Sequence, residues 1–365
     1  MSRAKSPYGP LAHLLSLLLC SHLIHGATNT RIGLLLPPDT PGRQSLLLAA
    51  NLTTTLPLNP PLPTADLIVR GRIGQWGDDG TEAARLALDD AVLGLITPPD
   101  GTASHLVLQV AGRTGVPTIT LCPDTSVVGA GIPWSLQVIP DTQKQALTIL
   151  KEIRNHHPPP WIAIVPEGRA GREISNDLAR VTTTIHHPTP VVLALPANPD
   201  SYTNLVQQAL HPIPTAILLW LDTKPAAKLA SLLRQQGYSG ILAGPLNLQS
   251  PEFTGTAGPH ATGFLLPAWS PSSSQTLTSF STLYTSQAGT PPTPADLLAA
   301  DAVILLRNIL TPATTPGRVQ LPDNLSGLSG PLTFDASGRR MLPLHLLRWQ
   351  SDSWQPLNSS PGPQH

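Results

Sequence analysis

Charge, aromatic side chains and cysteine are all scarce in this sequence. Charged residues make up 12% of the 365 positions and aromatic residues 4%, and the 22 basic side chains balance the 22 acidic ones. A neutral balance gives no electrostatic basis for binding nucleic acid or an anionic membrane surface. The two cysteines are Cys20 and Cys122. If Cys20 is removed with a signal peptide, neither an internal disulfide nor a thiolate metal site can form.

Long hydrophobic runs are also missing. Residues 1–27 contain basic residues, an apolar stretch at 11–23 and small residues at the end. This order is typical of a secretory signal peptide, and polar residues interrupt the stretch too often for a membrane span. No later segment reaches the roughly 18 apolar residues of a transmembrane helix. We therefore expect a mature protein exported to the periplasm, without a lipid anchor because Leu19, which is not small, precedes Cys20.

The motifs of common catalytic sites are absent as well. The sequence contains no GxSxG elbow, no phosphate-binding Walker loop and no HExxH zinc motif. Its histidine pairs, at 156–157 and 186–187, are flanked by prolines. Adjacent side chains seldom converge on one metal ion, so we interpret both pairs as solvated loop residues. The sequence predicts a protein that is not an enzyme and that holds neither a cofactor nor a metal.

The most informative pattern lies between residues 89 and 140. An apolar strand, a helix and a second strand follow one another there, at 91–96, 103–114 and 118–121. Short punctuated loops between them indicate a βαβ unit, whose strands are parallel. Ligands of such sheets bind at the carboxyl ends of the strands. The turns at 97–102 and 122–126 are therefore the first candidates for a binding site.

The same alternation continues along the chain. Strands are predicted before the unit at 31–37 and 67–69, and after it at 161–165, 191–195, 216–220 and 240–243. Helices are predicted between them at 142–157, 172–181, 202–210 and 225–236. Regular alternation over two stretches predicts two doubly wound α/β lobes, and the length allows each lobe its own core.

Several short motifs, in this order, resemble the type I periplasmic binding proteins, the leucine/isoleucine/valine-binding group of ABC transporter substrate-binding proteins. Gly94, Thr97, Thr102 and the run GVPTIT at 115–120 match the first-lobe core of that family. The segment LAADA at 298–302 matches a region of its late helices, and LSGPLTFDASG at 328–338 its ending. The resemblance covers nearly the whole mature chain. It implies two Rossmann-like lobes joined by a hinge that the chain crosses three times.

The resemblance also implies where the lobes begin and end. We place the crossings near Pro140, Ala261 and Pro331, and we interpret 263–266 as the strand that returns the chain to the first lobe. The predicted first lobe is then 28–140 with 262–331, the second is 141–261 with 332–357, and 358–365 is a disordered tail.

The strand-end turns supply the predicted ligand-binding residues. In the first lobe these are Thr97, Asp100, Thr102, Asp124 and Thr125, and in the second Ala170, Asp222 and Asn247. The start of the helix at 103 suits a ligand carboxylate, because a helix N-terminus is an anion site. Thr102 equally suits the simpler role of capping that helix. Cys122 is either a small buried residue or a group that faces the ligand.

Two of these positions depart from the amino-acid binders of the family. Ala170 stands where those proteins place an aromatic residue, and the turn at 244–247 lacks their acidic residue. Asp222, Asp124 or Asp100 could pair with a ligand ammonium instead. The alternative is that these aspartates are turn residues that bond to their own backbone.

The resemblance implies an exported substrate-binding protein of an ABC importer, which acts as a monomer and works with a membrane permease. Its small-molecule ligand would be an amino acid, an amide or a small carboxylate, captured between the lobes by hinge closure. The alternative is a regulatory protein of the same fold that binds a protein partner, as cell-wall synthase activators and receptor ectodomains do. An exported hydrolase is disfavoured, since no nucleophile and base stand at a suggestive spacing.

Overall fold

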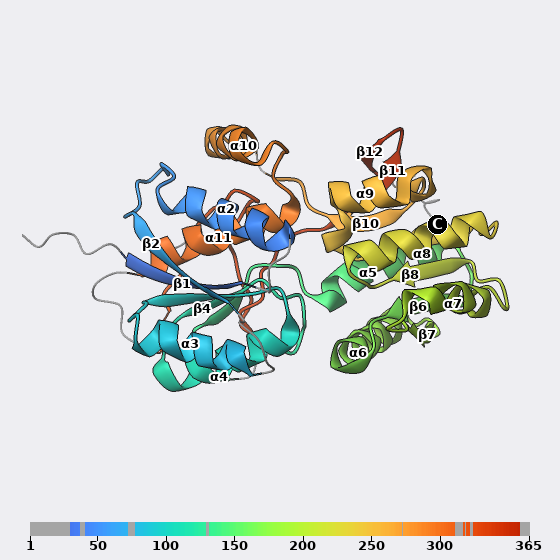
Figure 1. Ribbon diagram of the computed structural model, residues 1–365, viewed down its shortest axis with the longest axis horizontal. Helices are drawn as coiled ribbons and strands as arrows, with labels where there is room; N and C mark the ends of the chain where they lie inside the picture. The colour runs from blue at the N-terminus through green and yellow to red at the C-terminus, as the bar shows by residue number, and fades with distance from the viewer. Residues whose placement is uncertain are drawn as a thin grey trace, which may run out of the picture.

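The computed structural model describes residues 30–36, 41–71, 77–128, 131–271, 273–310, 317, 319–321 and 324–357. They form two lobes, each built around a mostly parallel sheet with helices on both faces (Figure 1). The predicted signal peptide, 1–27, and the predicted tail, 358–365, lie outside the described residues. Within the described ranges, no helix combines the length and the apolar character that a membrane crossing requires.

The first lobe contains a five-stranded sheet of order β2-β1-β3-β4-β5, in which every pairing is parallel. Its strands are β1 (Thr30–Leu36), β2 (Ala65–Gly71), β3 (Gly94–Thr97), β4 (Thr118–Thr120) and β5 (Ser135–Gln137). Its helices are α2 (Pro41–Thr54), α3 (Asp78–Leu88), α4 (Gly101–Thr114), α10 (Gln275–Ala288) and α11 (Pro294–Ile309). Helices α2 and α11 cover one face of the sheet, and α3 and α4 cover the other (Figure 1).

Burial on both faces explains why β1 is a continuous apolar run. Ile32, Leu34 and Leu36 are buried in the cluster that α2 and α11 share, whereas Leu35 is buried in the cluster of α3 and α4. Successive side chains of a strand point to opposite faces, so both sets must be apolar when both faces are covered.

The second lobe contains a seven-stranded sheet of order β12-β11-β10-β9-β8-β6-β7, antiparallel only from β10 to β12. Its strands are β6 (Trp161–Val165), β7 (Val191–Ala194), β8 (Ala216–Leu219), β9 (Ile241–Ala243), β10 (Leu265–Ala268), β11 (His345–Gln350) and β12 (Ser353–Pro356). Its α-helices are α5 (Thr142–His156), α6 (Gly168–Thr184), α7 (Tyr202–Ala209), α8 (Thr223–Gln235) and α9 (Pro251–Ala257). Three short 3₁₀ turns are η1 (Pro199–Ser201), η2 (Leu246–Leu248) and η3 (Gly258–Ala261).

The chain passes between the lobes three times, and two passages lie later than the sequence predicted. The segment at 263–266 does not return to the first lobe, because β10 pairs with β9 and β11 in the second sheet. Leu332 and Leu342 are buried in the core of the first lobe, not the second. An apolar pattern identifies a strand but does not encode which sheet it joins. The passages lie between Gln137 and Thr142, Ala268 and Gln275, and Leu342 and His345.

Hydrogen bonds hold the region of the first and third passages together. The backbone N–H of Gln137 donates to the carbonyl oxygen of Gly338 at 2.8 Å, and that of Arg340 donates to Gln137 at 3.0 Å. The guanidinium of Arg339 lies 3.3 Å from the carboxylate of Asp141. The two passages therefore leave the first lobe side by side.

A buried ion pair fixes the last segment of the first lobe onto α11. Nη1 of Arg340 lies 2.9 Å from Oδ2 of Asp301, and both side chains are fully buried. The carboxylate also accepts the hydroxyl of Ser329 and the backbone N–H of Leu328, the latter at 2.5 Å. This network of four residues therefore joins the segments 298–302 and 328–338, which the sequence analysis identified as two separate motifs.

Candidate functional site

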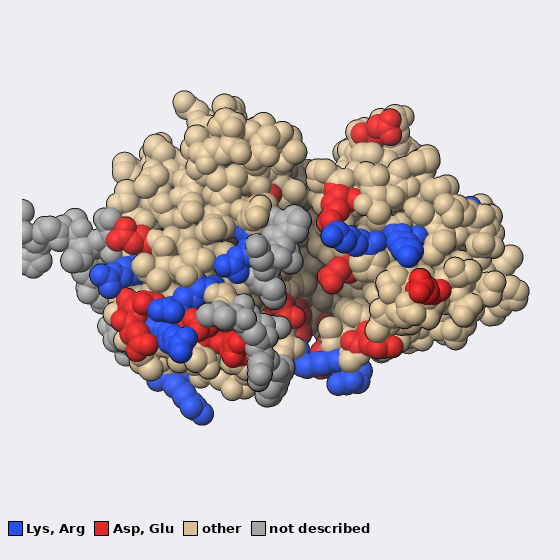
Figure 2. Space-filling view, viewed as in Figure 1, with Lys and Arg blue, Asp and Glu red and all other residues tan. Residues whose placement is uncertain are grey.

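A cavity of about 470 Å³ lies between the two lobes. Most of its lining residues follow the carboxyl ends of β3 and β4 in the first lobe and of β6, β8 and β9 in the second, and residues of α5 and α11 also line it. The furrow between the lobes is visible in the space-filling view, with acidic atoms along its edges (Figure 2). Both sheets therefore present to one cleft the edge at which parallel sheets bind ligands.

Six of the eight predicted site residues line this cavity. They are Asp100, Thr102, Asp124, Ala170, Asp222 and Asn247. Thr97 is instead fully buried inside the first lobe, where its hydroxyl bonds to those of Ser104 and Thr120 at 2.8 and 2.9 Å. Thr125 is also buried, and its hydroxyl donates to Oδ2 of Asp177 at 2.8 Å. The structure therefore places Thr97 in the core and Thr125 in a contact between lobes.

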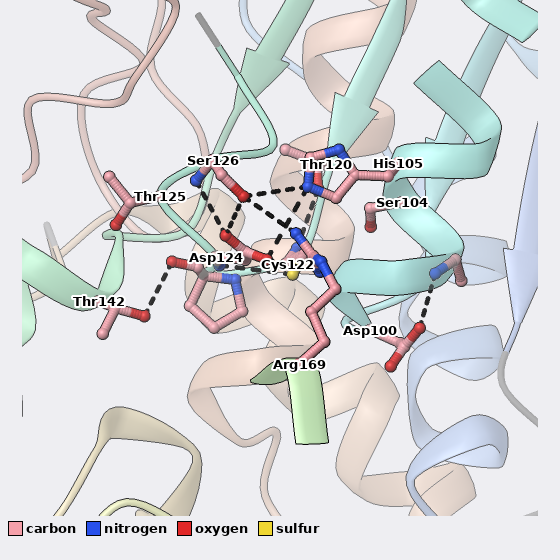
Figure 3. Close-up of polar contacts among 12 residues, drawn as sticks. Asp100, Ser104, His105, Thr120, Cys122, Asp124, Thr125, Ser126, Thr142 and Arg169 are labelled. Carbon is pink, nitrogen blue, oxygen red and sulfur yellow. Dashed lines mark hydrogen bonds and ion pairs between the residues drawn. The ribbon is translucent and has the colours of Figure 1, made fainter. Parts of the chain in front are cut away.

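The start of α4 is capped by Asp100 rather than by Thr102. Oδ1 of Asp100 accepts the backbone N–H of Ala103 at 2.7 Å (Figure 3). Thr102 lies in the first turn of the helix and lines the cavity. Aspartate is among the strongest N-cap residues, which explains the preference. A carboxylate of the chain itself thus occupies the helix terminus that the sequence assigned to a ligand carboxylate.

Across the cleft, Arg169 of α6 reaches the turn after β4 (Figure 3). Its Nη1 lies 3.2 Å from Oδ2 of Asp124, and its Nη2 donates to the hydroxyl of Ser126 at 3.2 Å. Ser126 in turn donates to Asp124 through its backbone N–H and its hydroxyl, at 2.9 and 2.6 Å. We call Arg169, Asp124 and Ser126 the Arg169 clasp. The clasp joins the lobes, and it engages the one arginine that lines the cavity among the described residues.

His105 of α4 adjoins the clasp. Its Nε2 lies 3.0 Å from the hydroxyl of Ser126 and 4.0 Å from the carboxylate of Asp124. Burial lowers the pKa of His105, and the positive charge of Arg169 lowers it further, which outweighs the opposing effect of Asp124. His105 therefore acts near pH 7 as a neutral hydrogen-bonding neighbour of the clasp and does not add a second positive charge.

A second contact between lobes surrounds Asp177 of α6. Its carboxylate accepts the hydroxyl of Thr125 at 2.8 Å and the side-chain amide of Gln143 at 2.8 Å, and it lies 3.2 Å from Nη1 of Arg180. The backbone N–H of Thr142 also donates to the carbonyl oxygen of Pro123 at 2.8 Å. Asp177 is thus neutralised and hydrogen-bonded by the chain, although it lies at the border of the cavity.

Asp222 differs from the other aspartates of the cleft. It stands at the N-cap of α8 but makes no capping bond there, and its side chain has no hydrogen bond or ion pair with any described residue. The surrounding protein raises the pKa of its carboxyl group by reducing hydration, and the negative charge of Asp100 raises it further. Because Asp222 is nevertheless open to the cleft, its carboxylate is available to a bound molecule.

The remaining predicted positions have structural explanations. Ala170 is exposed at the cleft, and a Cβ at the next residue, Gly171, would lie 1.8 Å from the carbonyl oxygen of Pro166. Only glycine fits at 171, whereas position 170 has room for a larger side chain. The amide of Asn247 donates to the carbonyl oxygen of Leu221 at 3.3 Å. Cys122 is buried beside the cavity, and burial raises the pKa of its thiol to about 12, so it is not a reactive thiolate.

Alongside polar residues such as Gln145 and Ser250, apolar side chains form much of the remaining cavity wall. They include Leu46, Leu121, Ile139, Ile174, Trp220, Leu246 and Leu298. Among the described residues, no group of three or more histidine, cysteine or acidic side chains is arranged to hold a metal ion. A mostly apolar cavity with a few convergent polar groups is typical of a site for a small organic molecule.

Residues 74–342 match the sequence profile of a family described as "Periplasmic binding protein". Among solved structures, a leucine binding protein from Thermotoga maritima is 16% identical, with a TM-score of 0.77 over 90% of this chain and 97% of that one. A branched-chain amino acid transporter substrate binding protein from Streptococcus pneumoniae, in complex with isoleucine, is 13% identical, with a TM-score of 0.75 over 90% and 98%.

A third similar structure is a solute binding protein of an ABC transporter from R. palustris, in complex with benzoate. It is 13% identical, with a TM-score of 0.78 over 90% of this chain and 95% of that one. No curated protein matches the chain by sequence. At these identities the likeness establishes the fold, whereas the ligands belong to the proteins in which they were seen.

Proposed function

The chain belongs to the periplasmic binding protein family, and on that premise we propose that it captures a small solute and delivers it to the permease of an ABC importer. The family is one of non-catalytic binding proteins. The observation that carries the proposal is the cavity between the lobes, which strand ends of both sheets line. Its volume of about 470 Å³ lies within the range of small-molecule sites.

Capture follows from the way the lobes are connected. Groups from both lobes face the cavity, and the three connecting passages allow the lobes to move relative to one another. A solute that contacts both lobes favours the closed state by the difference between its affinities for the closed and open states. Binding and closure are then one linked event, and the permease can distinguish the closed protein from the open one.

We propose that this activity takes place in the periplasm, which the predicted signal peptide supports, and that the protein acts as a monomer. The sequence left three ligand classes open, namely amino acids, amides and small carboxylates. Similar structures contain isoleucine or benzoate, which shows that this fold accommodates ligands of such size. The charges that line this cavity bear on the choice among the classes.

A second candidate function is the binding of a protein partner by a scaffold of the same fold. The clasp and the Thr125–Asp177 contact favour it, because these side chains hold the lobes together by themselves. In that case the cleft would not need to close on a metabolite, and binding would occur on the outer surface of the lobes.

A thermal-shift screen of the chain from Thr28 onward tests the proposal. The panel contains amino acids, amides, carboxylates and amines. A ligand that binds only the folded state adds RT ln(1 + [L]/Kd) to the free energy of unfolding, so its effect grows with concentration. We expect at least one concentration-dependent increase in Tm. No increase with any small solute, together with saturable binding to a periplasmic protein, would favour the scaffold instead.

Matched tryptophan variants show whether a hit occupies the cleft. Ala170→Trp places a large side chain in the cavity, and Ala288→Trp places the same side chain at the exposed end of α10. We expect the first variant to lose the Tm increase and the second to retain it. Retention by both variants would place the solute outside the cleft.

A further inference from the structure

We propose that the solute is an organic ammonium or amidinium cation without a carboxylate group, held between Asp100 and Asp222. This inference rests on the proposed function and specifies the class of solute that the cleft selects. Three observations support it: the balance of charges around the cavity, the placement of two carboxylates on opposite walls, and the use that the chain makes of its anion-binding groups.

The charges that line the cavity are mostly negative. Among the described lining residues they are the carboxylates of Asp100, Asp124, Glu173, Asp177 and Asp222, and the guanidinium of Arg169. Arg169 is paired with Asp124, and Asp177 is paired with Arg180. The carboxylates of Asp100, Glu173 and Asp222 have no cationic partner within the described part of the chain. These three charges together attract a cation into the cleft.

Two of these carboxylates approach the cleft from different lobes. Asp100 follows β3 in the first lobe, and Asp222 follows β8 in the second. They are near enough that the charge of Asp100 contributes to the raised pKa of Asp222. Two negative charges on facing walls oppose closure, whereas a cation between them is attracted by both. The same pair of residues therefore makes a positively charged solute favour the closed state.

Two of the groups at the cleft that could hold a ligand carboxylate are already engaged. At the N-terminus of α4, the backbone N–H of Ala103 is bonded to the carboxylate of Asp100. The guanidinium of Arg169 is bonded to Asp124 and Ser126. At these two groups a solute carboxylate would have to displace a partner, and throughout this part of the cleft it would be repelled by Asp100 and Asp222. An α-amino acid would gain from its ammonium and lose from its carboxylate, so a cation lacking the carboxylate binds better.

Four compounds that share the branched five-carbon chain of leucine test the charge of the solute directly. Leucine has both charges, leucinamide and 3-methylbutylamine have only the positive charge, and 4-methylpentanoate has only the negative one. Calorimetric titration of the chain from Thr28 onward, in a buffer free of amines, compares their affinities. We expect both cations to bind at least tenfold more tightly than leucine, and 4-methylpentanoate to show no binding.

Asparagine substitutions assign the effect to the two carboxylates. Asp100→Asn and Asp222→Asn each remove a charge, and asparagine caps a helix about as well as aspartate, so α4 keeps its cap. We expect each variant to bind leucinamide at least tenfold more weakly. The matched control Asp200→Asn removes an exposed carboxylate that does not line the cleft, and its affinity should be unchanged.

The outcomes separate this inference from the proposed function. If only neutral or anionic solutes bind in the thermal-shift panel, the chain is a solute receptor and the charge assignment is wrong. If leucine or 4-methylpentanoate binds more tightly than the amines, the assignment is also wrong. If no solute of any charge binds, both the inference and the proposed function fail.

Discussion

The interior of the first lobe and the cleft each contain an aspartate carboxylate, but only the one in the interior has partners within the described chain. The carboxylate of Asp301 is fully buried and is bonded to Arg340, Ser329 and the N–H of Leu328. The carboxylate of Asp222 is open to the cleft and has no partner among the described residues. Buried polar groups are normally satisfied within the protein. A carboxylate that the chain satisfies serves the fold, whereas one that the chain leaves without a partner is available for binding.

The largest effect should come from breaking the buried pair. Asp301→Ala leaves the charge of Arg340 buried without a carboxylate to balance it, which costs about 3–5 kcal/mol of unfolding free energy. Urea denaturation measures the loss, and Ser329→Ala, which removes the hydroxyl bonded to Asp301 and Arg340 but leaves the ion pair, should cost only about 1–2 kcal/mol. If Asp301→Ala were as stable as the parent, the pair would not hold the last segment of the first lobe.

The same change at Asp222 should affect binding and leave the fold intact. We expect Asp222→Ala to weaken any solute with a free ammonium by more than tenfold, or about 1.4 kcal/mol. The variant should unfold at no lower urea concentration than the parent, because it removes a carboxylate whose raised pKa shows that its charge is disfavoured in the folded state. Unchanged affinity in calorimetry would remove Asp222 from the site.

Acidification should reproduce that loss of affinity. The pKa of Asp222 is raised by burial and by Asp100, so its carboxylate takes up a proton at a higher pH than an ordinary aspartate. A cationic solute should bind tightly above this raised pKa and lose affinity as the pH falls through it. The folded protein itself should gain stability over the same interval, since the disfavoured charge disappears. Titrations between about pH 7 and pH 4 in the parent and in Asp222→Asn measure the difference.

The smallest effect on stability is expected at the clasp. The side chain of Arg169 is 36% exposed, and exposed ion pairs contribute about 0–1 kcal/mol. Arg169→Gln should therefore hardly alter unfolding, but it should shift the lobes toward the open state and increase the radius of gyration in X-ray scattering. An unchanged scattering profile would show that the clasp does not hold the lobes closed. Arg172→Gln, an exposed change in the same helix, is the matched control.

The sequence predicted the architecture of each lobe because the relevant signals are local. The apolar run of β1 and the break at 115–117 locate the βα units, and the strand-end rule then locates the cleft. The rule could not tell which of Thr97 and Thr102 faces the ligand, because both lie in the predicted turn. Thr97 is the last residue of β3 and points into the core, whereas Thr102 lies on the first turn of α4 and lines the cavity.

The features that the sequence did not predict depend on distant contacts. Residues 263–266 form a strand as expected, but their sheet is decided by pairing with β9 and β11. The clasp depends on Arg169 meeting Asp124 from the other lobe. The only local signal was that Arg169 lies next to Ala170, in a turn already assigned to the site. A basic residue in such a turn is a candidate partner for an acidic residue in a turn of the other lobe, here Asp124.

The pair of Asp301 and Arg340 also sets an order for the maturation of the molecule. The first lobe begins with β1, near residue 30, yet its core includes α11 and its last salt bridge requires Arg340. During synthesis, the lobe that starts first therefore cannot be completed until residue 340 has emerged. The second lobe closes its sheet only with β11 and β12, later still. Neither lobe can therefore complete its native structure until nearly the whole chain has been synthesised, and the two lobes become complete within a few residues of one another.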